Sequence, residues 1–181
     1  FYDCPLNSVF IGRMLSYGTQ FRFGYSPFAN NESLTKARLG NYVTKIQANL
    51  FRDCKAFTTL NYNGNCKPTE VEGYAFAGCK SILSSDSVLQ VSVKTIGNGV
   101  FENCEKLANV IINPSVTSIG NYAFNGCTAL TQVTIEESEE TLSLGYNYCY
   151  NIYDDYNNHP GRGLFYDCPL NSVFIGRMLS Y

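Results

Sequence analysis

A seventeen-residue segment occurs twice in this chain, and its second copy is identical to its first. Residues 1–17, FYDCPLNSVFIGRMLSY, recur letter for letter as residues 165–181. A fold with one closed core does not readily hold the same segment at two places, whereas an array that grows by adding units does. We therefore searched the sequence for shorter internal repeats.

A shorter pattern, Phe-x-x-Cys, contains six of the eight cysteines. We expect its residues to form a shared structural core: Phe1 and Cys4, Phe51 and Cys54, Phe76 and Cys79, Phe101 and Cys104, Phe124 and Cys127, and Phe165 and Cys168. Phe28 fits the same frame, with Asn31 at the cysteine position. Successive phenylalanines are separated by 27, 23, 25, 25, 23 and 41 residues, so the usual unit has 23–25 residues.

Each unit combines two short extended pieces with a tight turn. Apolar residues alternate in LTQVTI (130–135), and a period of two predicts a strand. After a turn at NPS (113–115), the segment 116–120 predicts a second strand, and NYAFNGC (121–127) predicts one helical turn. A unit this short cannot bury its own apolar residues, so neighbouring units must stack. The sequence therefore predicts a solenoid of about 7–8 coils with parallel strands about 4.8 Å apart.

One stretch also carries a resemblance to a known family. VTSIGNYAFNGCTALTQVTI (116–135) is similar to the repeat of BspA-type leucine-rich-repeat proteins, which are named for a surface protein of Bacteroides, and weaker copies lie at 93–112, 43–62 and 71–82. The resemblance covers nearly the whole chain apart from 13–27 and 140–164. It implies a leucine-rich-repeat-like, right-handed superhelix of short parallel strands and short helical turns. It also implies a secreted or surface-attached binding protein without a catalytic motif.

Composition excludes several classes of function. Thirteen basic and fifteen acidic residues give a net charge of −2, without visible polarity along the chain, and this argues against a nucleic-acid partner. No apolar run reaches the roughly 18 residues of a membrane span. The sequence begins with Phe1, so we expect any targeting signal to lie upstream.

The cysteines and the other reactive residues favour structural roles. No Cys-x-x-Cys pair is present, so we expect neither a metal site nor a cofactor. The framed cysteines should form a buried column of free thiols, although disulfides between adjacent coils are a geometric alternative. Cys66 and Cys149 lie outside the frame and are expected to be more exposed. His159 is expected in a solvated loop, and Glu136, Glu137, Glu139 and Glu140 in a solvated turn.

Two aromatic insertions, at 17–28 and 145–163, are the candidate ligand-binding segments. Their candidate residues are Tyr17, Phe21, Phe23, Tyr25, Tyr146, Tyr148, Tyr150, Tyr153 and Tyr156. Tyrosine offers a large contact area and a hydroxyl, which suits recognition by loops that project from a stacked scaffold. The alternative is that these residues pack against the column.

These features predict residues 1–181 to be one solenoid fragment of a non-enzymatic protein. We expect a secreted or cell-surface repeat protein that mediates adhesion by binding an extracellular protein or cell-surface macromolecule. The alternative is a structural spacer or fibre-forming array without a specific ligand. Exposed coil edges also make end-to-end self-association an expectation.

Overall fold

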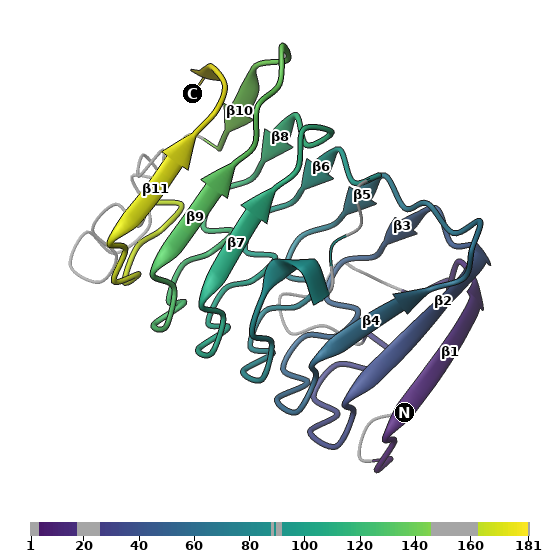
Figure 1. Cartoon of the computed structure of the whole chain (residues 1–181). Helices are drawn as coiled ribbons and strands as arrows, with labels where there is room; N and C mark the ends of the chain where they lie inside the picture. Colours follow the sequence, from purple (N-terminus) through teal and green to yellow (C-terminus); the bar gives the residue numbers. More distant parts are fainter. Residues whose placement is uncertain (1–3, 18–25, 88, 90–91, 146–162, 181) are drawn as a thin grey trace, which may run out of the picture.

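The chain winds into an open-ended stack of coils whose paired strands all run parallel (Figure 1). The computed structural model describes residues 4–17, 26–87, 89, 92–145 and 163–180. Its buried apolar residues form one continuous cluster from Ile11 to Leu142. The predicted solenoid is confirmed.

Two rows of strands run along the stack. The first row contains the longer strands and consists of two three-stranded sheets, ordered β1-β2-β4 and β11-β9-β7. Its strands are β1 (Ser8–Arg13), β2 (Lys36–Tyr42), β4 (Thr59–Tyr62), β7 (Asn109–Ile112), β9 (Gln132–Ile135) and β11 (Ser172–Ile175). The second row is one six-stranded sheet, ordered β12-β10-β8-β6-β5-β3. Its strands are β3 (Lys45–Ile46), β5 (Glu70–Val71), β6 (Thr95–Ile96), β8 (Ser118–Ile119), β10 (Leu142–Leu144) and β12 (Leu179–Ser180).

The alternating sequence of the longer strands explains their two faces. In β9, Val133 and Ile135 are buried, whereas Gln132 and Thr134 lie on the other face. The six strands of the second sheet indicate slightly fewer coils than the seven to eight predicted.

The first row is interrupted between β4 and β7, where the sequence is polar. Ser84 makes a single bridge to Asn109, and Ser85–Ser87 form a short 3-10 helix, η1. Ser85 is buried, and its hydroxyl accepts a hydrogen bond from the backbone N–H of Ile111 at 3.0 Å. A side chain thus satisfies a backbone group that a strand would otherwise pair.

The predicted helical turns are wrong in detail. Apart from η1, the described residues contain no helix, and the Phe-x-x-Cys segments are successive tight turns. In one of them, Cys104 N donates to Phe101 O at 3.1 Å, while Phe101 N donates to Ala123 O of the next coil at 2.8 Å. The residue before each described framed cysteine of the inner coils is left-handed, with φ between 57° and 72° at Asp53, Gly78, Asn103 and Gly126. A left-handed residue ends helical growth, so alternate N–H groups turn to the neighbouring coil.

The framed phenylalanines form a continuous stack through the core. Phe28, Phe51, Phe76, Phe101, Phe124 and Phe165 follow one another with ring centroids 5.5–6.1 Å apart. Their planes differ by 7° to 18°, so the rings are stacked rather than edge-to-face. Such pairs contribute about 0.5–1.5 kcal/mol each beyond the burial of their area.

The framed cysteines connect each coil to the one before it. The thiol of Cys79 donates to Phe51 O at 3.0 Å, and that of Cys104 donates to Phe76 O at 3.2 Å. Cys54, Cys127 and Cys168 make the same bond to Phe28, Phe101 and Phe124. All described cysteines are free, so the predicted column of free thiols is confirmed for Cys54, Cys79, Cys104 and Cys127, which are buried.

The two outermost coils depart from the predicted core. Cys4 is exposed, and Phe165 and Cys168 are only half-buried, because each of these coils packs against a neighbour on one side. Phe1 lies outside the described residues. Cys66 was expected to be exposed but is buried, and its thiol contacts Val43 O at 3.6 Å.

Gly120→Ala should destabilise the stack, because successive coils approach closely at the Ile-Gly positions. A Cβ at residue 120 would lie 2.6 Å from the backbone nitrogen of Asn98. We expect a loss of about 1–3 kcal/mol in the free energy of unfolding, measured by urea denaturation. Gly64→Ala is the control, since a Cβ there meets nothing within 4 Å, and an equal loss in both variants would contradict the close approach.

Alkylation should distinguish the buried thiols of Cys54 and Cys104 from the exposed thiol of Cys4. Burial raises the pKa of Cys54 to about 12 and also raises the pKa of Cys104, so little thiolate forms at mildly alkaline pH. We expect iodoacetamide to modify Cys4 in the folded protein and to reach Cys54 and Cys104 only after urea unfolds the protein. Peptide mass spectrometry measures this order, and equal rates in the folded protein would be inconsistent with a closed core.

Candidate binding surface

The outer face of the longer strands carries side chains that the core does not use. Phe10, Arg38 and Asn61 lie side by side on β1, β2 and β4, because these strands pair in register. Ile111, Thr134 and Phe174 form the corresponding row on β7, β9 and β11. We call these two sets the outer rows.

The outer rows contain two large exposed aromatic residues. Phe10 is 54% exposed and Phe174 is 53% exposed, and they occupy the same position in the two copies of the repeated segment. The Arg38 guanidinium lies 4.8 Å from the centroid of the Phe10 ring. An exposed cation–π pair contributes about 0.5–1 kcal/mol and holds both side chains in a defined position.

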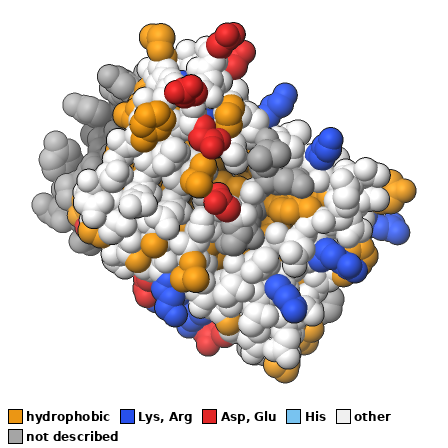
Figure 2. All heavy atoms as spheres, viewed as in Figure 1, with side chains coloured by type: hydrophobic (Ala, Val, Ile, Leu, Met, Phe, Trp, Pro, Cys, Tyr) orange, Lys and Arg blue, Asp and Glu red, His pale blue; other side chains and the backbone are white. Residues whose placement is uncertain are grey.

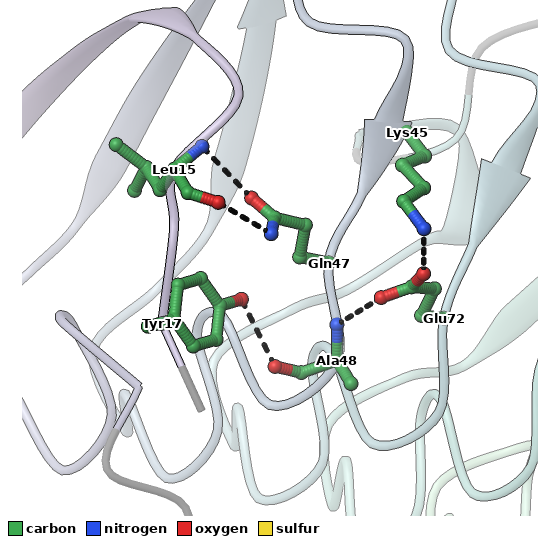
Figure 3. Close-up of polar contacts among 6 residues, drawn as sticks. All are labelled: Leu15, Tyr17, Lys45, Gln47, Ala48 and Glu72. Carbon is green, nitrogen blue, oxygen red and sulfur yellow. Dashed lines mark hydrogen bonds and ion pairs between the residues drawn. The ribbon is translucent and has the colours of Figure 1, made fainter. Parts of the chain in front are cut away.

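Polar contacts hold the described start of the first aromatic insertion against the stack (Figure 3). The Gln47 side chain accepts from Leu15 N at 3.1 Å and donates to Leu15 O at 2.8 Å. The Tyr17 hydroxyl donates to Ala48 O at 3.0 Å, and its partial burial raises the pKa of Tyr17. One amide side chain therefore pairs with Leu15 as a neighbouring strand would.

Further polar contacts join this region to the next coil, which contains β5. The Glu72 carboxylate accepts from Ala48 N at 2.9 Å and forms an ion pair with Lys45 (Figure 3). At the other end of the insertion, the Ser26 hydroxyl donates to Leu50 O at 3.1 Å, and Phe28 is buried. Both ends of this insertion are thus attached to the stack.

Most of the predicted ligand-binding residues lie outside the described residues. Tyr17 is the exception, and it is half-buried with its hydroxyl bonded to the backbone. The remaining candidates outside the described residues are Phe21, Phe23, Tyr25, Tyr146, Tyr148, Tyr150, Tyr153 and Tyr156. Cys149 and His159 also lie there.

A buried arginine is a feature that the sequence did not indicate. Arg177 is 7% exposed, and its guanidinium donates to backbone carbonyls at the end of β7 and in the turn after it. The acceptors, at 2.6–3.4 Å, are the carbonyl oxygens of Ile112, Asn113, Pro114 and Val116. Because β9 lies between β7 and β11, this side chain spans an intervening coil. Burial lowers the pKa of Arg177, and Glu136 opposes that shift.

Charge is polarised along the stack, contrary to the expectation from total counts. Residues 1–67 contain eight Lys and Arg but three Asp and Glu, whereas residues 68–181 contain five and twelve. Figure 2 shows basic side chains over the β1–β4 end and acidic side chains towards the upper end of β9 and β10. Glu137, Glu139 and Glu140 are exposed in the segment between β9 and β10, as predicted.

The described residues contain neither a cluster of metal ligands nor a membrane-spanning helix. No three side chains of His, Cys, Asp or Glu in these ranges lie close enough together to hold a metal ion. Within the same ranges, no helix has the length and apolarity needed to cross a membrane.

Comparison with known proteins extends the resemblance to the whole chain. The family model described as BspA type leucine rich repeat region matches six copies, over residues 1–86, 22–152 and 69–181. No curated protein matches the sequence.

Two solved structures share the fold. A leucine-rich repeat protein from Bacteroides ovatus is 29% identical over 74% of this chain, with a TM-score of 0.60. A T. pallidum leucine-rich repeat protein is 24% identical over 81% of the chain, with a TM-score of 0.61. This chain spans 32% and 59% of the lengths of those two proteins. Since the family model covers every coil, the chain belongs to the BspA-type leucine-rich-repeat family.

Proposed function

We propose that this chain is a non-enzymatic binding module of a secreted or cell-surface protein. Its partner is an extracellular protein or another cell-surface macromolecule, and attachment to that partner produces adhesion. Membership of a family named for a Bacteroides surface protein supports this location.

The exposed pair of Phe10 and Arg38 is the observation that carries the proposal. The ring is half exposed although the guanidinium lies only 4.8 Å from its centroid. Aromatic and arginine side chains supply much of the binding energy at protein interfaces. Phe174 presents the same side chain from another coil, so two contacts on one rod could add avidity without strong single contacts.

The aromatic insertions extend the proposed surface. Tyr17 and Gln47 hold the start of segment 17–28 against the coil that contains β3. A fixed attachment point lowers the entropy lost when a projecting segment binds a partner. The tyrosines of segment 145–163 belong to the same proposal.

One observation favours a spacer as the second candidate function. Of the four outer-row residues between Phe10 and Phe174, only Asn61 and Thr134 are small and polar, and neither is a large anchor for a partner. Such a surface keeps an array soluble and offers few anchors to a partner.

Paired substitutions in the outer rows test the proposal. Immobilised fibronectin and fibrinogen serve as extracellular-matrix probes, with biolayer interferometry as the measurement. For whichever probe the wild type binds, Phe10→Ser combined with Phe174→Ser should weaken binding about tenfold or more, because both anchors are lost. Tyr148→Ser combined with Tyr153→Ser tests the second insertion in the same way.

The control variant is Tyr42→Ser, which removes an aromatic residue that is exposed but lies outside the outer rows. It should bind as the wild type does. If Tyr42→Ser lost as much binding as the double variant, the outer rows would not be the site. A wild type that bound neither probe nor whole cells would favour the spacer.

A further inference from the structure

The outer face of β1, β2 and β4 carries two exposed cations. Lys36 and Arg38 alternate with the buried Ala37 and Leu39 along β2, so both project from the outer face. Residues two apart on a strand are separated by about 6–7 Å along it. Neither cation forms an ion pair with a carboxylate of the described residues. The outer face therefore holds two neighbouring positive charges that no acidic side chain of those ranges neutralises.

The acids that are nearest in the described sequence have other partners. Glu32 forms an ion pair with Lys55, and the Asp53 carboxylate lies 3.4 Å from Arg52 Nε. Asp86 is exposed, but it belongs to η1, where the first row of strands is interrupted. The positive charge therefore extends over β1, β2 and β4 and ends before η1.

Phe10 places an aromatic ring beside these charges. The ring leans over two glycines, because a Cβ at Gly12 would lie 3.5 Å from its Cε1 and a Cβ at Gly40 would lie 3.2 Å from its Cζ. The absence of side chains at both positions leaves room for the ring near the sheet. The Arg38 guanidinium lies 4.8 Å from the ring centroid. An apolar surface and a positive charge are thus held together at one place.

The exposure of this ring does not depend on which coil lies beside it. β1 pairs with the following strand, β2, whereas the identical segment in β11 pairs with the preceding strand, β9. Phe10 and Phe174 are nevertheless exposed to nearly the same extent, 54% and 53%. A neighbouring coil on either side therefore leaves the outer face uncovered.

The neighbouring strand determines the charge beside each copy of the ring. Phe10 lies in register with Arg38 of β2, whereas Phe174 lies in register with Thr134 of β9. One copy of the same sequence is thus placed next to a cation and the other next to a neutral side chain. The two phenylalanines form a matched pair in which exposure is equal and the adjacent charge differs.

We propose that the outer face of β1, β2 and β4 binds an acidic polysaccharide, a linear glycan that carries carboxylate or sulfate groups. This inference rests on the proposed function and specifies the class of partner that its Phe10 and Arg38 pair recognises. We call Phe10, Lys36, Arg38, Thr59 and Asn61 the basic face.

Each side chain of the basic face matches one part of such a glycan. The planar fork of Arg38 pairs with two oxygens of one anionic group, and Lys36 supplies a second positive charge. The apolar C–H face of a sugar ring packs on the exposed ring of Phe10. Thr59 and Asn61, in register with Lys36 and Arg38, offer hydrogen bonds to sugar hydroxyls.

Other anionic partners fit the basic face less well. A protein interface has an apolar core, and the basic face offers one large apolar side chain. Nucleic acids are held through many phosphate contacts, whereas two cations project here and the whole chain has a net charge of −2. A linear glycan needs few contacts at each site, since its repeating units can engage successive copies of a site on one array.

Biolayer interferometry with three immobilised polysaccharides tests this inference. Heparin carries sulfate and carboxylate groups, polygalacturonate carries carboxylate groups alone, and dextran is neutral. We expect wild type to bind heparin or polygalacturonate, but not dextran, at about 50 mM salt and to lose most of this binding at about 0.5 M salt, because salt screens exposed charges. Binding to either anionic glycan supports the proposal, and the stronger one identifies the anionic group.

Two double variants of equal net charge locate the site. Lys36→Gln combined with Arg38→Gln should weaken glycan binding about tenfold or more, because both charged contacts are lost. The control, Lys94→Gln combined with Lys106→Gln, removes two exposed cations outside the basic face and should bind as wild type does. Equal losses in both double variants would show attraction to the overall charge and would overturn the proposal.

The two phenylalanines provide a second matched comparison. Phe10→Ser should weaken glycan binding about two- to fivefold, because the ring and its contact with the guanidinium are lost. Phe174→Ser should leave binding unchanged, since no cation lies in register with that ring. Circular dichroism checks that both variants keep the wild-type fold. Equal losses in these two variants would also overturn the proposed site.

Protein and nucleic-acid probes distinguish this inference from the proposed function. If neither anionic glycan binds at low salt, the inference fails, while fibronectin or fibrinogen binding that depends on Phe10 would leave the proposed function in place. Duplex DNA is the third probe. If it bound as tightly as heparin and lost binding in the Lys36 and Arg38 double variant, the face would recognise charge alone, and the inference would be overturned.

Discussion

Successive coils are joined through one backbone carbonyl, that of the framed phenylalanine, from Phe28 to Phe124. Phe76 O accepts the N–H of Cys79 in its own turn at 3.0 Å and the thiol of Cys104 from the next coil at 3.2 Å. A carbonyl oxygen has two lone pairs, so both are satisfied without water. The residue at the cysteine position must be small, apolar enough for the core and able to donate a hydrogen bond. Cysteine meets these requirements, and the same two bonds recur at the carbonyls of Phe51, Phe101 and Phe124.

The other recurrent residues are determined by the limited space between adjacent coils. The residue before cysteine must adopt positive φ, and Gly78, Asn103 and Gly126 do so at low cost. The glycine after isoleucine meets the backbone of the preceding coil, as Gly120 does at Asn98. Most of the repeat is therefore determined by contacts between coils, while the outer rows are free to vary.

Features that recur in every coil could be predicted from the sequence, whereas features found in a single coil could not. Parallel strands and the buried Phe and Cys positions follow from periodicity. The helical turns were predicted wrongly because a spacing of Phe and Cys three residues apart also fits tight turns with left-handed residues. Cys66 lies outside the frame, but a turn after β4 directs it inward to Val43 O. Arg177 donates to carbonyl oxygens about sixty residues away. Every residue has a backbone carbonyl, so the sequence does not indicate which of them accepts.

The two copies of the repeated segment show which exposures depend on a coil's own sequence and which depend on the neighbouring coils. Phe10 and Phe174 are exposed to nearly the same extent, 54% and 53%, because they project from a sheet face that no coil covers. Ile11 and Ile175 differ widely, since their burial is set by the following coil. Outward residues therefore carry the same surface wherever the segment is placed, and inward residues become buried only when a coil follows. A solenoid built in this way can repeat a binding surface without altering the contacts that hold its coils together.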